Sequence, residues 1–256
     1  MEPDKIPLLD NAVSIVREAS QKKVTLRIMG AMAVLLHSER SRHLFKDMKR
    51  TFTDIDLIGY SSQFKLIKDH LANMGYQSQT SGYEVAVSSH GKRSIYSDPK
   101  TKTHVDIFYD RLEMCHTVDF KNRLELDYPT ISLADLLLEK MQIVHLNNKD
   151  MIDTLVMLSE HDIGDSNAET IDIEYVSRLL AKDWGFYYTV TTNLKNIKNV
   201  LGKLEALAER DKKNVDEKIE KAIKRIEEEP KSAGWKIRSK IGPSKKWYND
   251  VEEVVR

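Results

Sequence analysis

The sequence predicts an α/β (α+β) core, in which a small mixed sheet is flanked by helices, followed by an all-helical C-terminal domain. Short strand-like apolar runs alternate with helical patterns up to Tyr128-Pro129, and beyond this dipeptide the helical period takes over. The length of 256 residues, with 41% hydrophobic and 31% charged residues, suits roughly two domains. We therefore expect an α/β domain over residues 1–128, a helical domain over 129–230 and a distinct tail over 231–256.

The elements of the first half follow from the spacing of apolar residues and from turn-forming residues. Gly30 and Gly75 stand where one helix is expected to begin and another to end. Helices are predicted at 8–20, 31–38 and 64–74, and strands at 24–28, 54–60, 84–88 and 103–109.

The second half shows five helical patterns and then changes character. The helices are predicted at 132–146, 149–161, 171–182, 186–210 and 214–229. The segment Lys231–Tyr248 holds six basic residues, no acidic residue and the aromatic side chains of Trp235, Trp247 and Tyr248. Cations bind phosphates and aromatic rings stack on bases, so this tail can bind RNA. A tail that folds back over the helices explains the same residues.

Charge and cysteine content exclude several classes of protein. Lys+Arg and Asp+Glu both number 40, so no overall excess of charge indicates a nucleic-acid or membrane partner. A single cysteine, Cys115, cannot form an internal disulfide or a cysteine-rich zinc site. The sequence shows neither a signal peptide nor an apolar run of membrane-spanning length. We expect a cytoplasmic protein with no membrane partner.

Three carboxylates are the main candidates for chemistry. Asp54 and Asp56 are one residue apart on a predicted strand, so both side chains point to the same face. Asp106 lies within another strongly strand-forming run. Alternating acids are common on solvated strand faces, but these strands have a buried character, and converging carboxylates repel one another unless a cation binds. The pattern therefore favours a divalent metal site for Mg²⁺ or Mn²⁺.

Gly30 stands where a predicted strand turns sharply into a helix. A glycine at this position lets the backbone approach a phosphate, and the start of a helix favours negative charge. A simple turn between a strand and a helix explains the same glycine.

At these positions the chain resembles the nucleotidyltransferase superfamily with the polymerase beta-like fold. The family signature is a strand, a Gly-Gly or Gly-Ser turn, an Asp-x-Asp on the next strand and a third acid on a later strand. Here these parts are Gly30-Ala31, Asp54-x-Asp56 and Asp106. Two features depart from the pattern, because Ala31 replaces glycine or serine and the spacing from turn to acids is longer than usual. The extra segment 38–50 is rich in basic residues and fits either a basic loop over the site or a solvated helix extension.

The resemblance continues into the helical half and is strongest to the stand-alone abortive-infection and toxin-type nucleotidyltransferases of bacteria and archaea. That branch has a helix ending in lysine, here Thr130–Lys140, followed by a Lys-Asp-x-x-Asp motif, here Lys149–Asp153. On a helical wheel Lys140 falls in the middle of an apolar face, so its ammonium needs an anion. A nucleotide phosphate meets this need, and so does a structural carboxylate. Periodicity alone places Asp150 and Asp153 on the surface.

The resemblance implies a metal-dependent enzyme that transfers a nucleoside monophosphate from a nucleoside triphosphate. It assigns catalysis and metal binding to Asp54, Asp56 and Asp106, and nucleotide binding to Gly30, Ala31, Lys140 and Asp150. It makes residues 1–128 the catalytic domain and residues 129–230 the domain that completes the nucleotide site.

The acceptor is left open by the sequence. Resemblance to the toxin-type branch implies an RNA end, such as that of tRNA, and an antitoxin as a partner. A protein side chain or a small molecule such as an aminoglycoside is an alternative acceptor. The rival function is a catalytically silent module of the same fold that binds RNA or a partner protein.

Overall fold

A computed structural model describes residues 6–79, 86–88, 91–167 and 169–251. Its contacts divide the chain into two units. The first comprises the N-terminal part up to Leu36 together with Thr51–Glu113 and Thr117–Ser132. The second comprises His37–Arg50, Met114–His116 and the chain from Leu133 onward. The outer ends of the first predicted domain and of the predicted tail, residues 1–5 and 252–256, lie outside the described residues.

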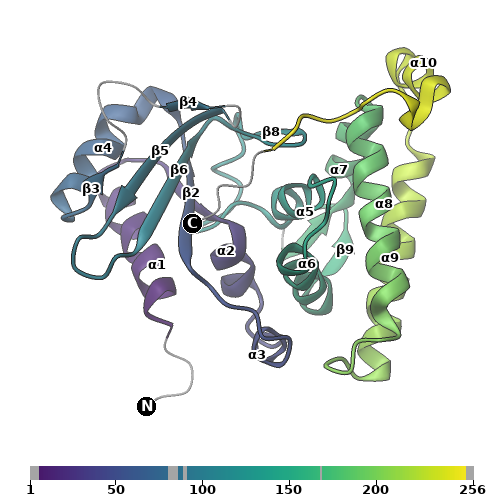
Figure 1. Cartoon of the computed structure of the whole chain (residues 1–256), viewed down its shortest axis with the longest axis horizontal. Helices are drawn as coiled ribbons and strands as arrows, with labels where there is room; N and C mark the ends of the chain where they lie inside the picture. The colour runs from purple at the N-terminus through teal and green to yellow at the C-terminus, as the bar shows by residue number, and fades with distance from the viewer. Residues whose placement is uncertain (1–5, 80–85, 89–90, 168, 252–256) are drawn as a thin grey trace. The chain divides into compact units, whose positions relative to one another are not determined.

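A mixed sheet forms the centre of the first unit and confirms the predicted fold class (Figure 1). Its main strand order is β1-β2-β6-β5-β3, with β4 paired to β5 and with β7 joining β6 to β8. Strands β2 and β6 run parallel, whereas β1 is antiparallel to β2 and β5 is antiparallel to β6. The strands are Leu26–Met29 (β1), Asp54–Gly59 (β2), Gln77–Ser78 (β3), Ala86–Ser88 (β4), Gly91–Ser97 (β5), His104–Tyr109 (β6), Arg111–Glu113 (β7) and Thr117–Asp119 (β8).

The helices of the first unit begin and end close to the predicted positions. They are Pro7–Gln21 (α1), Gly30–His37 (α2) and Phe64–Asn73 (α4), with a short 3₁₀ turn at Ser61–Gln63. Helix α1 buries apolar residues at helical spacing, namely Leu9, Ala12, Ile15, Val16 and Ala19. It contacts β1, β2 and α4, so this apolar stripe covers the sheet.

The second unit is built from helices, as predicted. They are His43–Asp47 (α3), Leu133–Met141 (α5), Asn148–Glu160 (α6), Ile173–Leu180 (α7), Trp184–Leu201 (α8), Glu209–Glu228 (α9) and Ala233–Ile241 (α10), with a 3₁₀ turn at Gly242–Ser244. Helices α8 and α9 are the long pair in Figure 1 and pack against each other. Helix α8 ends earlier than predicted, and Gly202 follows its last residue. None of the helices in the described ranges has the length and apolar composition that a membrane span needs.

Several elements were not predicted from the sequence, among them the strands β3, β7 and β8 and the helix α10. Strand β5 was not predicted, and it pairs along most of the length of β6. A short parallel pair, Asp162–Gly164 (β9) with Thr170–Asp172 (β10), lies within the helical unit. The predicted strand 84–88 is described only at Ala86–Ser88, because residues 84 and 85 lie outside the described residues.

Candidate functional site

Two of the three predicted carboxylates occupy matching positions on neighbouring strands. In the parallel register of β2 and β6, Asp56 is the partner of Asp106, and Asp54 is the partner of His104. Asp54 and Asp56 are half-buried, and the alternate residues Ile55 and Leu57 are fully buried on the other side of β2. Partner residues in parallel strands point to the same face, so the three acids share one face of the sheet.

Gly30 brings the start of α2 against Asp56. Its φ of +67° is in the left-handed region, and a Cβ atom placed on it would lie 2.7 Å from Oδ2 of Asp56. Strand β1 sets this approach, because Met29 pairs with Asp56 in the antiparallel register. Glycine is therefore required at this position for two reasons, namely the backbone angle and the carboxylate beside it. Ala31 follows as the second residue of α2.

Asp106 forms an ion pair that the sequence analysis missed. It is 2% exposed and pairs with Nη2 of Arg93 on β5. Arg93 is the register partner of Phe108, two residues beyond Asp106, and its guanidinium lies 5.3 Å from the centre of the Phe108 ring. The strand-like run Arg93-Ser-Ile-Tyr96, bounded by Gly91 and by the turn at 98–101, was the available signal for this strand.

The three acids have the right chemistry for a divalent cation, but their oxygens are not gathered into a ready-made cage. The described residues include a set of three potential ligands whose atoms all lie within 4.8 Å of one another, but this set does not contain the three acids. The Asp54 carboxylate accepts a hydrogen bond from Thr53 Oγ1 at 3.0 Å, and Asp106 pairs with Arg93. Carboxylates on adjacent strands supply the hard oxygen ligands that Mg²⁺ and Mn²⁺ prefer. A cation held by all three acids would need their side chains to turn toward one another, while Arg93 contacts one oxygen of Asp106, Oδ2.

The compact set of potential ligands consists of His37, His161 and Glu169, and hydrogen bonds account for it. Nε2 of His161 lies 2.7 Å from the backbone oxygen of His37, and Nδ1 lies 3.2 Å from the backbone oxygen of Glu169. Both ring nitrogens of His161 thus face carbonyl oxygens, and a nitrogen that donates a hydrogen bond is not available to bind a metal. We therefore assign this cluster a structural role.

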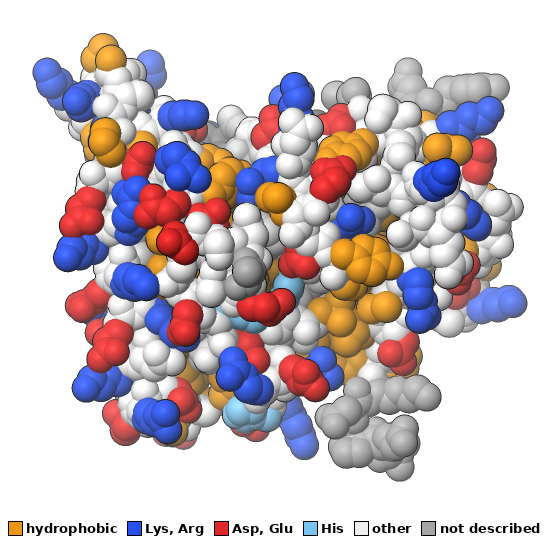
Figure 2. Space-filling model, turned by 180° about the vertical axis from the view of Figure 1, so that it is seen from behind, with side chains coloured by type: hydrophobic (Ala, Val, Ile, Leu, Met, Phe, Trp, Pro, Cys, Tyr) orange, Lys and Arg blue, Asp and Glu red, His pale blue; other side chains and the backbone are white. Residues whose placement is uncertain are grey.

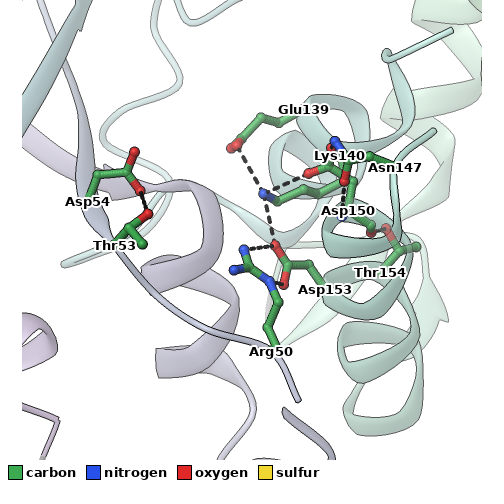
Figure 3. A network of polar contacts seen from close by, with 9 residues as sticks. All are labelled: Arg50, Thr53, Asp54, Glu139, Lys140, Asn147, Asp150, Asp153 and Thr154. Carbon is green, nitrogen blue, oxygen red and sulfur yellow. Dashed lines mark hydrogen bonds and ion pairs between the residues drawn. The ribbon is translucent and has the colours of Figure 1, made fainter. Parts of the chain in front are cut away.

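Lys140 is surrounded by carboxylates within the helical unit (Figure 3). Its Nζ lies 3.1 Å from Asp153, 3.3 Å from Asp150 and 3.7 Å from Glu139. Burial by itself lowers the pKa of Lys140, but these carboxylates outweigh it and raise the pKa above its ordinary value. Structural carboxylates therefore provide the anion that Lys140 requires, whereas its predicted contact with a nucleotide stays a prediction.

Asp153 is fully buried, so its predicted surface position is wrong. Arg50 makes two parallel contacts to it, from Nε to Oδ1 at 2.8 Å and from Nη2 to Oδ2 at 3.0 Å (Figure 3). Two cations thus compensate one buried carboxylate. Asp150 is half-buried, and its backbone N–H is capped by the Asn147 side chain at 2.9 Å.

The basic segment 38–50 forms part of the second unit. It contains the short helix α3, and Arg40 contacts Glu160 at the end of α6 at 2.8 Å. Together with the Arg50–Asp153 pair, this contact joins both ends of the segment to α6. Helix α3 is a separate helix and not an extension of α2, which ends at His37, and ion pairs use the positive charges of Arg40 and Arg50.

The aromatic residues of the tail pack on α8, in agreement with a tail that folds back. The Trp247 Nε1–H donates to Thr189 Oγ1 at 3.0 Å, and the Trp235 ring meets Tyr187 edge-on with 5.1 Å between ring centres. On the outer side of α10, Ile237 is 66% exposed. Figure 2 shows hydrophobic side chains among Lys and Arg in this region, at the upper left.

The known proteins that this chain is similar to are solved structures of low sequence identity. No family model matches the sequence, and no curated protein matches it either. The solved structure of antibiotic-resistance factor ANT(2'')-Ia is 14% identical, with a TM-score of 0.39, over 68% of this chain and 92% of that chain. An antigenic nucleotidyltransferase-like protein from Paracoccidioides brasiliensis is 15% identical, with a TM-score of 0.42, over 89% of this chain and 96% of that chain.

Proposed function

We propose that this chain is a metal-dependent nucleotidyltransferase, which moves a nucleoside monophosphate from a nucleoside triphosphate to an acceptor hydroxyl. The observation that carries the proposal is the position of Asp56. Its carboxylate lies against Gly30 at the start of α2, and the register sets it beside Asp106 on the next strand. A helix start and a cluster of carboxylates at one point suit a triphosphate and the cation that accompanies it.

The proposed roles follow from burial and from position in the sheet. Asp54 and Asp56 are half-buried and would hold Mg²⁺ or Mn²⁺, and Asp106 would complete the set. A bound cation supplies positive charge to the triphosphate. The backbone N–H groups of Gly30 and Ala31, in the first turn of α2, would bind the terminal phosphates.

The transfer itself is a substitution at phosphorus. The acceptor oxygen forms a bond to the α-phosphorus, the bond from this phosphorus to the α–β bridging oxygen breaks, and pyrophosphate leaves. Asp106 is the proposed acceptor of the hydroxyl proton. The ion pair with Arg93 occupies one oxygen of this carboxylate, Oδ2.

Lys140 and Asp150 remain proposed nucleotide-binding residues because of the resemblance described above. Their ion pair also gives them a structural role, so a test must separate the two. Lys140→Met should raise KM for the nucleoside triphosphate if Lys140 binds it. A variant that loses thermal stability but keeps KM would leave Lys140 with the structural role alone.

The proposed acceptor is an RNA end, as in the toxin-type relatives, and an antitoxin is a proposed partner. The test is incubation of the protein with each α-labelled triphosphate, Mg²⁺ or Mn²⁺, and total cellular RNA or protein, alongside Asp56→Ala. We expect label in RNA with the unmodified protein and none with the variant. Label in protein would change the acceptor, and equal labelling by the variant would remove the proposed site.

The alternative is a silent module that binds RNA or a protein and catalyses no transfer. The observation that favours it is the pairing of Asp106 with Arg93. A silent module would transfer no label to any acceptor, whether or not a divalent cation is present.

A further inference from the structure

Two arginine–aspartate pairs with buried carboxylates differ in the number of contacts between the guanidinium and the carboxylate. Arg50 contacts both oxygens of Asp153 through two nitrogens, at 2.8 Å and 3.0 Å. Arg93 contacts Asp106 through Nη2, whereas its Nε is buried and has no hydrogen-bond partner within the described ranges. Bidentate pairs are stronger, and a buried donor without a partner costs free energy. The Arg93–Asp106 pair is therefore the more easily released.

The burial of Asp106 explains why a positive side chain lies beside it. The side chain of Asp106 is 3% exposed, and a buried carboxylate needs a positive partner. Arg93 reaches it diagonally across β5 and β6 and lies over the Phe108 ring. Because a cation is attracted to an aromatic face, this ring can keep the guanidinium in place after the carboxylate turns away.

We propose that Arg93 is a positioning residue that occupies Asp106 until a divalent cation displaces it. This inference rests on the proposed function, because it concerns the same carboxylates. Asp54 and Asp56 are half-buried and take up the cation first, whereas Asp106 joins only when the attraction of the cation exceeds that of Arg93. Arg93 thus weakens cation binding by the protein alone and delays completion of the site.

The test measures Mn²⁺ binding by the full chain, from the electron paramagnetic resonance signal of free Mn²⁺, without nucleotide. Arg93→Met removes the competing charge and should tighten binding by about tenfold or more. Arg93→Lys keeps the charge and should bind like the unmodified protein. The matched control is Arg111→Met, which removes an equal charge from the same unit. Arg111 serves as the control because it pairs with Glu113 on the surface and not with one of the three acids.

The outcomes separate this inference from the proposed function. Tighter Mn²⁺ binding by Arg93→Met, together with unchanged Mn²⁺ binding by Arg111→Met, supports the displacement of Arg93. Damage to the fold would instead weaken Mn²⁺ binding. Equal or weaker binding by Arg93→Met overturns it and leaves the proposed function standing. If neither protein binds Mn²⁺, the inference fails, whereas the proposed function, in which the cation accompanies the triphosphate, is decided separately by label transfer.

Discussion

Replacement of Gly30 by alanine tests whether the start of α2 and the Asp56 carboxylate act together. At φ +67° an alanine costs about 1–2 kcal/mol of backbone strain. Its Cβ would also lie 2.7 Å from Oδ2 of Asp56, and ordinary contact begins at 3.4 Å. The carboxylate must therefore move by about 0.7 Å. A displacement of this order in a reacting centre can lower the rate of transfer by about 100-fold.

The control for this substitution is Gly75→Ala. Gly75 belongs to the same unit and also has a positive φ, +91°, but a Cβ placed on it would meet no atom within 4 Å. Urea unfolding should show a loss of stability in both variants, whereas label transfer should fall only in Gly30→Ala. Equal transfer by the two variants would refute the reasoning, because it would show that the position of Asp56 does not matter for the reaction.

Three further predictions concern the second unit. Burial lowers the pKa of His116 to about 4, below the 6.5 of the unfolded chain, so the unfolded state binds more protons between these values. His116 should therefore contribute a drop of about 2 kcal/mol in the unfolding free energy from pH 7 to pH 5, and urea titrations of His116→Gln should lack this contribution. Asp153→Asn removes the buried carboxylate that pairs with Arg50 and Lys140, and it should lower the unfolding free energy by about 3–5 kcal/mol in the same assay. A loss below about 1 kcal/mol would contradict a stabilising role for these ion pairs. Gly185→Ala places a Cβ 2.6 Å from the backbone oxygen of Trp247, so limited trypsin digestion should cut the tail faster than in the control Gly234→Ala, which meets open space. Equal cleavage would show that the tail does not depend on this contact.

The sequence predicted the elements whose apolar residues follow a local period. Helix α1 and strand β2 begin and end within a residue of the expected positions, because their buried residues repeat every three to four or every two positions. The same period placed Asp54 and Asp56 on one face. The parallel register sets Asp106 beside Asp56 on the neighbouring strand, and their role in metal binding stays a prediction.

The parts that failed depend on partners far away along the chain. Asp153 has a polar side chain on a helix, so periodicity assigned it to the surface, but its partner Arg50 is 103 positions away. No local pattern contains that information. Arg93 was missed for another reason, because the short strand-like run that forms β5 was assigned to no element.

The measurement that tests the central claim most directly compares two labels on one triphosphate. With Mg²⁺ and the acceptor, label at the α-phosphate should become attached to the acceptor, and label at the γ-phosphate should leave as pyrophosphate. Asp56→Asn keeps the size of the side chain but removes its charge. This variant should neither attach the α-label to the acceptor nor release the γ-label as pyrophosphate. Transfer of the γ-label, or undiminished transfer of the α-label by Asp56→Asn, would contradict nucleotidyl transfer at these carboxylates.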